Sequence, residues 1–176
     1  MRLLITGILV ALLTACSAIG LRPEPPELPL LPLDGGPGPG VVKQRMTLVS
    51  AQRQLDFISV VRLQPEALSG VVLLPSGQSL LSYRFDGSGI QVTSALSSDL
   101  PVRDFVAMLQ FGLWPEHTLK NYYATRKGWT FDSQSPGQRT LSWQGTPVLQ
   151  KLSADGYFEI RQLQAGYVVR VENLKQ

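Results

Sequence analysis

The sequence predicts a mainly β protein of the α+β class, built on one curved antiparallel sheet with a short helical insertion. From Val41 onward, short segments rich in valine, leucine and aromatic residues alternate with turn signals. The spacing of about ten residues is what one strand and its turn use in an antiparallel meander. Between Asp99 and Thr125 the apolar period changes to three and four, as on one face of a helix. Strands, then helices, then strands fit one sheet with helices on one face.

The turns are marked by glycine, proline and aspartate, as in Pro75-Ser76-Gly77 and Asp86-Gly87-Ser88-Gly89. Ten strands are predicted between such turns, over residues 43–50, 54–63, 68–74, 79–85, 89–94, 128–132, 139–143, 147–152, 157–163 and 167–172.

Two helices are predicted in the insertion. The first spans 101–111, with Pro101 fixing its first turn and Gly112 ending it. Its inward face carries Val102, Phe105, Val106 and Leu109. The second begins at Pro115, and its inward residues are Leu119, Tyr122 and Tyr123.

The N-terminus carries a different signal. Arg2 precedes an apolar run, 3–13, which is shorter than the roughly 20 residues that span a bilayer. The run closes on Leu13-Thr14-Ala15-Cys16, and this pattern resembles the signal of bacterial lipoproteins. The alternative is an ordinary signal peptide or membrane helix with a buried free cysteine.

The lipoprotein resemblance implies that residues 1–15 are removed and that Cys16 carries a diacylglycerol and an acyl chain such as palmitate. Several chains, each contributing about 0.8 kcal/mol per buried methylene, make a durable membrane anchor. Ser17 stands where many enteric lipoproteins carry the aspartate that retains them at the inner membrane. We therefore expect the protein at the periplasmic face of the outer membrane.

Residues 16–40 are expected to be the lipidated cysteine and a tether, and residues 41–176 the folded domain. The stretch 21–40 is rich in proline and glycine, which favours a semi-rigid extended linker. Leu28, Leu30, Leu31 and Leu33 are then incidental. The alternative is that they lie back on the domain or on the membrane surface.

Composition argues against several function classes. A net charge of +3 is too weak to indicate nucleic acid. The sequence has one cysteine and one histidine, His117. These numbers argue against a disulfide framework, a zinc site and a histidine-based catalytic triad. No nucleophile elbow, phosphate loop or metalloprotease motif is present, so we expect no enzyme and no cofactor. A hydrolase or transferase is the weakest of the alternatives. Glu116, Asp86 and Asp155 fit helix-start and turn roles.

Some strands lack the alternation of a sheet with one wet face. The segments 57–61 and 71–74 are nearly all apolar, so both of their faces are expected to be dry. The first helix covers part of one face, and the remaining apolar surface either packs as a core or lines a ligand groove. The candidate groove residues, each of which could instead be ordinary core, are Phe57, Val72, Leu74, Leu81, Tyr83, Phe85, Trp129 and Trp143. Arg84, Arg161 and Arg170 are expected on polar strand faces.

The chain from about Met46 to Asn173 resembles a family of small bacterial lipoproteins similar to the lipoprotein carriers LolA and LolB. The segments that carry this resemblance are Leu68-Ser69-Gly70-Val71-Val72-Leu73-Leu74 with Gly77, Tyr83-Arg84-Phe85-Asp86, Phe111-Gly112-Leu113-Trp114-Pro115, Arg139-Thr140-Leu141 and Gly166-Tyr167-Val168-Val169-Arg170-Val171. It implies an incomplete antiparallel barrel whose concave apolar face is covered by helices and accepts acyl chains without a chemical reaction. Members are often encoded beside aryl-polyene or fatty-acid-synthase-like genes.

One departure from LolB concerns the turn Pro75-Ser76-Gly77-Gln78, which is short and polar where LolB has an apolar-tipped loop for lipoprotein delivery. The expected function is therefore binding or transfer of a different lipid-like cargo, such as an aryl-polyene lipid, by a monomer held on the membrane. The alternative is a non-catalytic assembly lipoprotein that binds another envelope protein through an exposed strand edge.

Overall fold

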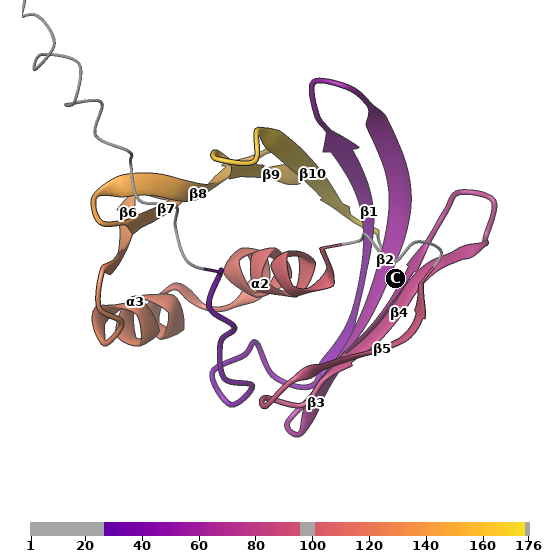
Figure 1. Cartoon of the computed structure of the whole chain (residues 1–176), viewed down its shortest axis with the longest axis horizontal. Helices are drawn as coiled ribbons and strands as arrows, with labels where there is room; N and C mark the ends of the chain where they lie inside the picture. Colours follow the sequence, from indigo (N-terminus) through magenta and orange to yellow (C-terminus); the bar gives the residue numbers. More distant parts are fainter. Residues whose placement is uncertain (1–26, 96–100, 175–176) are drawn as a thin grey trace, which may run out of the picture.

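The computed structural model describes residues 27–95 and 101–174, and in these ranges ten strands form one curved antiparallel sheet with two helices in its concavity (Figure 1). The strands are β1 (Gly40–Val49), β2 (Gln54–Gln64), β3 (Ala67–Leu73), β4 (Ser79–Phe85), β5 (Ile90–Ala95), β6 (Trp129–Ser135), β7 (Gln138–Trp143), β8 (Thr146–Ala154), β9 (Tyr157–Gln162) and β10 (Tyr167–Asn173). All ten predicted strands are confirmed, with ends that differ by a few residues.

The strand order is β5-β4-β3-β2-β1-β10-β9-β8-β7-β6. The two halves of the chain meet where β1 pairs with β10, in a register that joins Gln44 to Asn173 and Val49 to Val168. β5 and β6 each pair on one side, so the sheet does not close. The expected incomplete barrel with a helical insertion is confirmed.

The helices are α2 (Val102–Leu113) and α3 (Glu116–Ala124). α2 runs two residues beyond its predicted end, and Gly112 lies inside it rather than terminating it. A Cβ atom at Gly112 would lie 3.0 Å from Ile160 Cδ1 and 3.2 Å from a ring carbon of Phe158. The glycine therefore permits close approach of α2 to β9, and the helix ends because Trp114 is extended before Pro115.

The apolar strands are covered on one face only. On β2 the concave-face residues Phe57 and Val61 are buried, whereas Ile58 and Val60 on the convex face are partly exposed. The β3 neighbours of these two, Leu73 and Val71, are partly exposed as well. The expectation that both faces are dry is wrong for these strands, because the helices lie on the concave side alone (Figure 1).

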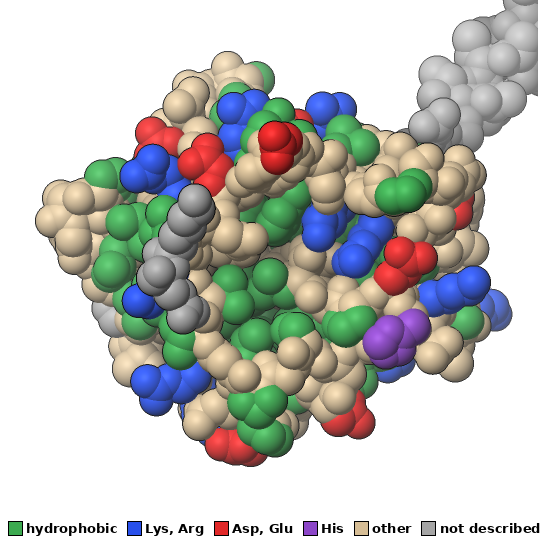
Figure 2. All heavy atoms as spheres, turned by 180° about the vertical axis from the view of Figure 1, so that it is seen from behind, with side chains coloured by type: hydrophobic (Ala, Val, Ile, Leu, Met, Phe, Trp, Pro, Cys, Tyr) green, Lys and Arg blue, Asp and Glu red, His purple; other side chains and the backbone are tan. Residues whose placement is uncertain are grey.

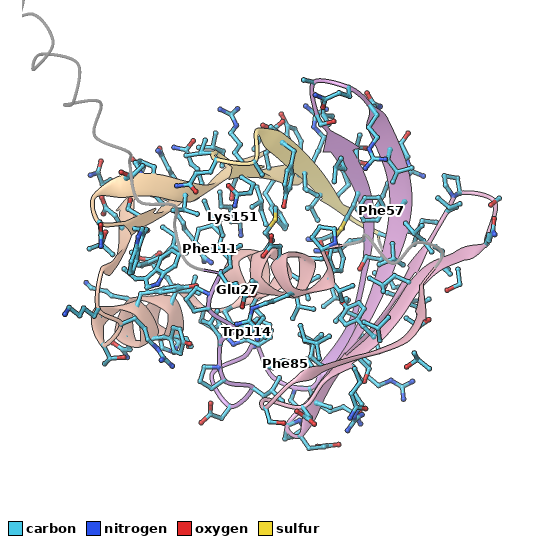
Figure 3. All side chains as sticks on the ribbon, viewed as in Figure 1. Glu27, Phe57, Phe85, Phe111, Trp114 and Lys151 are labelled. Atoms are coloured by element: carbon cyan, nitrogen blue, oxygen red, sulfur yellow. The ribbon has the colours of Figure 1, made fainter. Side chains whose placement is uncertain are left out.

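The segment 27–36, which we call the N-terminal strap, packs on the helices and is not a free linker. Leu28 and Leu31 are buried, and Leu31 N–H and C=O both hydrogen-bond the Gln110 side-chain amide, at 2.8 Å each. Trp114 Nε1 donates to Pro32 O, and Figure 3 shows Trp114 beside the strap. Leu30 and Leu33 are partly buried and pack against the same core, so the interpretation of the four leucines as incidental is wrong.

Residues 1–15 and Cys16, on which the signal and the lipid anchor were predicted, lie outside the described residues. Within 27–95 and 101–174, neither helix is long and apolar enough to cross a membrane.

Candidate functional site: an apolar pocket under helix α2

A pocket of about 360 Å³ lies between α2 and the concave face of the sheet. Its wall is formed by residues of β1, β2, β3, β4, β9 and β10 together with α2, and most of them are aliphatic or aromatic. Figure 2 shows the corresponding hollow with hydrophobic side chains on its floor. The pocket therefore lies at the middle of the sheet, where the two halves of the chain join.

Strand alternation explains how these side chains reach the pocket. Met46 and Leu48 on β1 face the same side of the sheet as Val169 and Val171 on β10, and the register pairs them directly. From the helix, Phe105 points to the same space from the first turn of α2. The sheet supplies the floor and α2 supplies the roof.

The polar wall groups are few. Gln44 is almost fully buried, and its Nε2 donates to Asn173 Oδ1 at 3.0 Å, so its amide is hydrogen-bonded within the sheet. Ser50, Gln52 and Arg53 belong to the β1–β2 hairpin at the edge of the pocket.

Three of the candidate groove residues, Phe57, Val72 and Leu81, lie in the pocket wall. Two others are in the packed core beside it. Tyr83 lies behind Phe105, edge-on with the ring centroids 5.8 Å apart, and Phe85 is 2% exposed. Figure 3 shows Phe57 and Phe85 at separate places along the sheet.

The remaining three groove candidates lie elsewhere. Trp129 and Trp143 pack against each other at 5.2 Å between ring centroids, and Trp129 also contacts Tyr123 of α3, in the other half of the sheet. Leu74 falls just beyond β3, where its N–H donates to Gln78 O and fixes the turn. The sequence pattern showed that these residues were apolar, but it could not show which part of the sheet α2 leaves open.

Two inward-facing cations that sequence reasoning missed lie beside the pocket. Lys151 Nζ donates to Gly112 O at 2.7 Å, and Arg139 Nη1 donates to Trp114 O at 2.9 Å. Both groups thus hydrogen-bond carbonyls at the C-terminal end of α2, where the helix dipole favours positive charge. The available signal was positional: Arg139 and Lys151 each lie two residues from a buried leucine, Leu141 and Leu149, on the same strand.

Burial disfavours the charged forms of both cations. It lowers the pKa of Lys151 to about 8, with a smaller contribution from the neighbouring charge of Arg139. Burial also lowers the pKa of Arg139, an effect that Glu116 partly offsets.

The arginines expected on polar strand faces do not reach the pocket. Arg161 and Arg170 form ion pairs with Glu159, at 3.2 and 3.0 Å. Arg84 is exposed, with its Nη1 3.5 Å from Ser69 Oγ.

The carboxylates singled out in the sequence lie in the first turn of a helix and in turns between strands. Glu116 is exposed at the start of α3. Asp86 accepts hydrogen bonds from Ser88 Oγ, Ser88 N and Gly89 N, and these lower its pKa to about 2. Across the described ranges, no group of three or more His, Cys, Asp or Glu side chains is placed to hold a metal ion.

Comparison with known proteins gives a family without a known activity. No curated protein matches the chain significantly. A family model described as a protein of unknown function matches residues 41–175, which include every strand from β2 to β10 and both helices. The chain therefore belongs to the DUF3261 family.

Proposed function

We propose that this protein is a lipid-binding or lipid-transfer lipoprotein of the outer membrane that accepts an acyl-linked cargo in the pocket under α2. The observation that carries the proposal is the pocket itself. Its volume of about 360 Å³ lies in the range of small-molecule sites, about 300–1,000 Å³, and its wall is predominantly apolar. Empty space lined in this way is filled most favourably by hydrocarbon.

The pocket's size suggests how much chain it could hold. Its volume of about 360 Å³ is near the lower end of the range for small-molecule sites, about 300–1,000 Å³. One acyl chain, or part of a longer polyene, is a fitting cargo.

The resemblance to LolA and LolB supports the same function. An open antiparallel sheet that holds helices in its concavity is the architecture that the resemblance implied. The turn Pro75-Ser76-Gly77-Gln78 is exposed and polar, which argues against lipoprotein insertion and favours a cargo such as an aryl-polyene lipid. The anchor on Cys16 would keep the pocket close to the membrane that supplies or receives this cargo.

The test uses the full-length lipoprotein, extracted gently from cells and analysed by native mass spectrometry for co-purifying lipid. The variant Val169→Phe places a larger side chain in the pocket wall. The control Val168→Phe makes the same change at the adjacent residue, which faces the opposite side of the sheet and lies outside the wall. We expect bound lipid in the wild type and in Val168→Phe, and much less in Val169→Phe.

A wild-type protein that carries no lipid would contradict the proposal, and so would equal lipid occupancy in the two valine variants. Circular dichroism and a thermal melt on each variant establish that the comparison is made between folded proteins.

A second function, assembly of another envelope protein, is favoured by one specific observation. The sheet ends at β5 and β6, and each end presents a strand edge that another chain could extend. Cross-linking in cells distinguishes the two functions. A stoichiometric protein partner joined at β5 or β6 would favour assembly, whereas labelled lipid at the wall of the pocket would favour lipid binding.

A further inference from the structure

Arg139 and Lys151 are direct cross-strand neighbours on the concave side of β7 and β8. Like charges placed opposite each other on a sheet repel. Arg139 contributes to lowering the pKa of Lys151, which is the physical sign of that repulsion. The pair is thus an electrostatically unfavourable arrangement that the fold retains.

Contacts within the chain balance this charge in part. The C-terminal end of a helix carries roughly half a negative elementary charge, whereas the two side chains carry two positive charges. Glu116 acts on Arg139 at longer range. Across the described part of the chain, however, neither cation forms an ion pair with a carboxylate; the three ion pairs there involve Arg103, Arg161 and Arg170.

Lys151, the partner of Arg139 in the pair, adjoins the pocket through two wall residues. Lys151 donates to the carbonyl of Gly112 and lies 4.4 Å from the ring centroid of Phe158, and both residues line the pocket. Figure 3 shows Lys151 between the sheet and α2, and Figure 2 shows lysine or arginine side chains at the rim of the hollow.

Within residues 27–95 and 101–174, both cations retain N–H donors that form no hydrogen bond. A lysine ammonium has three N–H donors and an arginine guanidinium five. Lys151 uses one donor, to Gly112 O, and Arg139 uses its Nη1 group, to Trp114 O at 2.9 Å and to Phe111 O at 3.5 Å. An anion at this end of the pocket could therefore receive hydrogen bonds from both side chains without breaking the contacts to α2.

We infer that Lys151 and Arg139 form the head-group end of the pocket and that the cargo is an anionic amphiphile, with a carboxylate or phosphate group against the two cations and its hydrocarbon under α2. This inference rests on the proposed function and narrows its class of ligand. It excludes neutral lipids, such as diacylglycerols or alcohols, as the preferred cargo.

The experiment compares photoreactive dodecanoate, dodecanol and dodecylamine, each carrying the same diazirine in its chain. The full-length lipoprotein is reconstituted in nanodiscs of fixed composition, and labelling of pocket peptides is measured by mass spectrometry. The wild type is compared with Lys151→Gln, Lys151→Arg and Arg139→Gln. Lys43→Gln is the control, because Lys43 is an exposed lysine of β1. Partitioning of each probe into the disc cancels in the ratio of wild type to variant.

We expect the wild type to be labelled most by dodecanoate. Lys151→Gln should lower dodecanoate labelling about tenfold, as the loss of a charge-assisted hydrogen bond would. The same variant should leave dodecanol labelling unchanged, since glutamine still offers an N–H to Gly112. Lys151→Arg should retain the preference for dodecanoate, Arg139→Gln should weaken it, and Lys43→Gln should match the wild type.

Equal labelling by dodecanoate and dodecanol in the wild type would overturn the inference but leave the proposed function standing. An equal fall in labelling by dodecanoate and by dodecanol in Lys151→Gln would also overturn the inference, because Lys151 would then only hold α2 in place. Failure of every probe to label the pocket would instead overturn the proposed function. If millimolar inorganic phosphate displaced dodecanoate, the two cations would be a site for a free anion, and the head-group assignment would be overturned.

Discussion

At the scale of single residues, Gly70 shows how tightly the core next to the pocket is packed. The Tyr83 ring lies directly over Gly70, in the space that a Cβ atom would occupy. Gly70→Ala should therefore lower the free energy of unfolding by about 1–3 kcal/mol, the usual cost of overpacking a core. Gly89→Ala is the matched control, because a Cβ there meets no atom within 4 Å. Urea unfolding of both variants measures the difference, and similar midpoints would refute the prediction.

A second prediction at this scale concerns the pH dependence contributed by Lys151. Its pKa is about 8 in the folded protein and 10.5 when unperturbed, so the unfolded chain binds more protons between these values. Stability contributed by this group must therefore rise as pH increases from about 8 to 10.5, and stay constant below 8. The gain should be of the order of 1 kcal/mol, since the partial exposure of the side chain screens the effect.

The free energy of unfolding is measured for the wild type and for Lys151→Gln at several pH values from 7 to 10.5. The difference between the two proteins gives the contribution of Lys151. The stability of the wild type relative to Lys151→Gln should increase above pH 8. Parallel pH profiles would show that the lysine is not desolvated in the folded state.

At the scale of elements, the N-terminal strap is an integral part of the core. Leu31 is fully buried, and its peptide groups are paired with Gln110. Leu31→Ala should cost about 2–5 kcal/mol of folding free energy, the range for a buried leucine. The control, Leu163→Ala, removes a leucine that is 44% exposed and should cost little. Thermal unfolding distinguishes the two variants. If Leu31→Ala were as stable as the wild type, the strap would be a linker and not part of the core.

The strap also shows why part of this fold could not be predicted from the sequence. The ten strands and two helices follow local signals, such as the alternation in Leu81, Tyr83 and Phe85 and the proline before each helix. Proline and glycine in the strap are equally local signals, and they correctly exclude helix and sheet. The burial of Leu31 depends instead on Gln110, which is 79 residues away.

The candidate site was predictable to a similar extent. Alternation identifies the concave-face residues, and Phe57, Val72 and Leu81 were chosen correctly for the wall. Tyr83 and Trp129 are equally apolar and also face inward, yet they pack against Phe105 and α3. The difference is set by where the two helices cross the curved sheet, which periodicity does not encode.

At the scale of the whole molecule, the sheet encloses two interiors of different density. Next to the pocket its concave face is solid, as at Val61, which is fully buried and lies outside the pocket wall. Around Val169 the same face borders open volume. The open sheet thus holds a rigid core that fixes the helices and a hollow that remains available to a ligand.

This difference predicts opposite responses to the same substitution. Val61→Phe must force extra atoms into a close-packed region and should cost about 1–3 kcal/mol or more. Val169→Phe can direct its ring into the pocket and bury apolar area there, so its cost should be below about 1 kcal/mol. Chemical denaturation of both variants without added lipid measures this contrast independently of binding. If Val169→Phe destabilises the protein as much as Val61→Phe, the volume under α2 is not accessible to hydrocarbon and the pocket cannot serve as a lipid site.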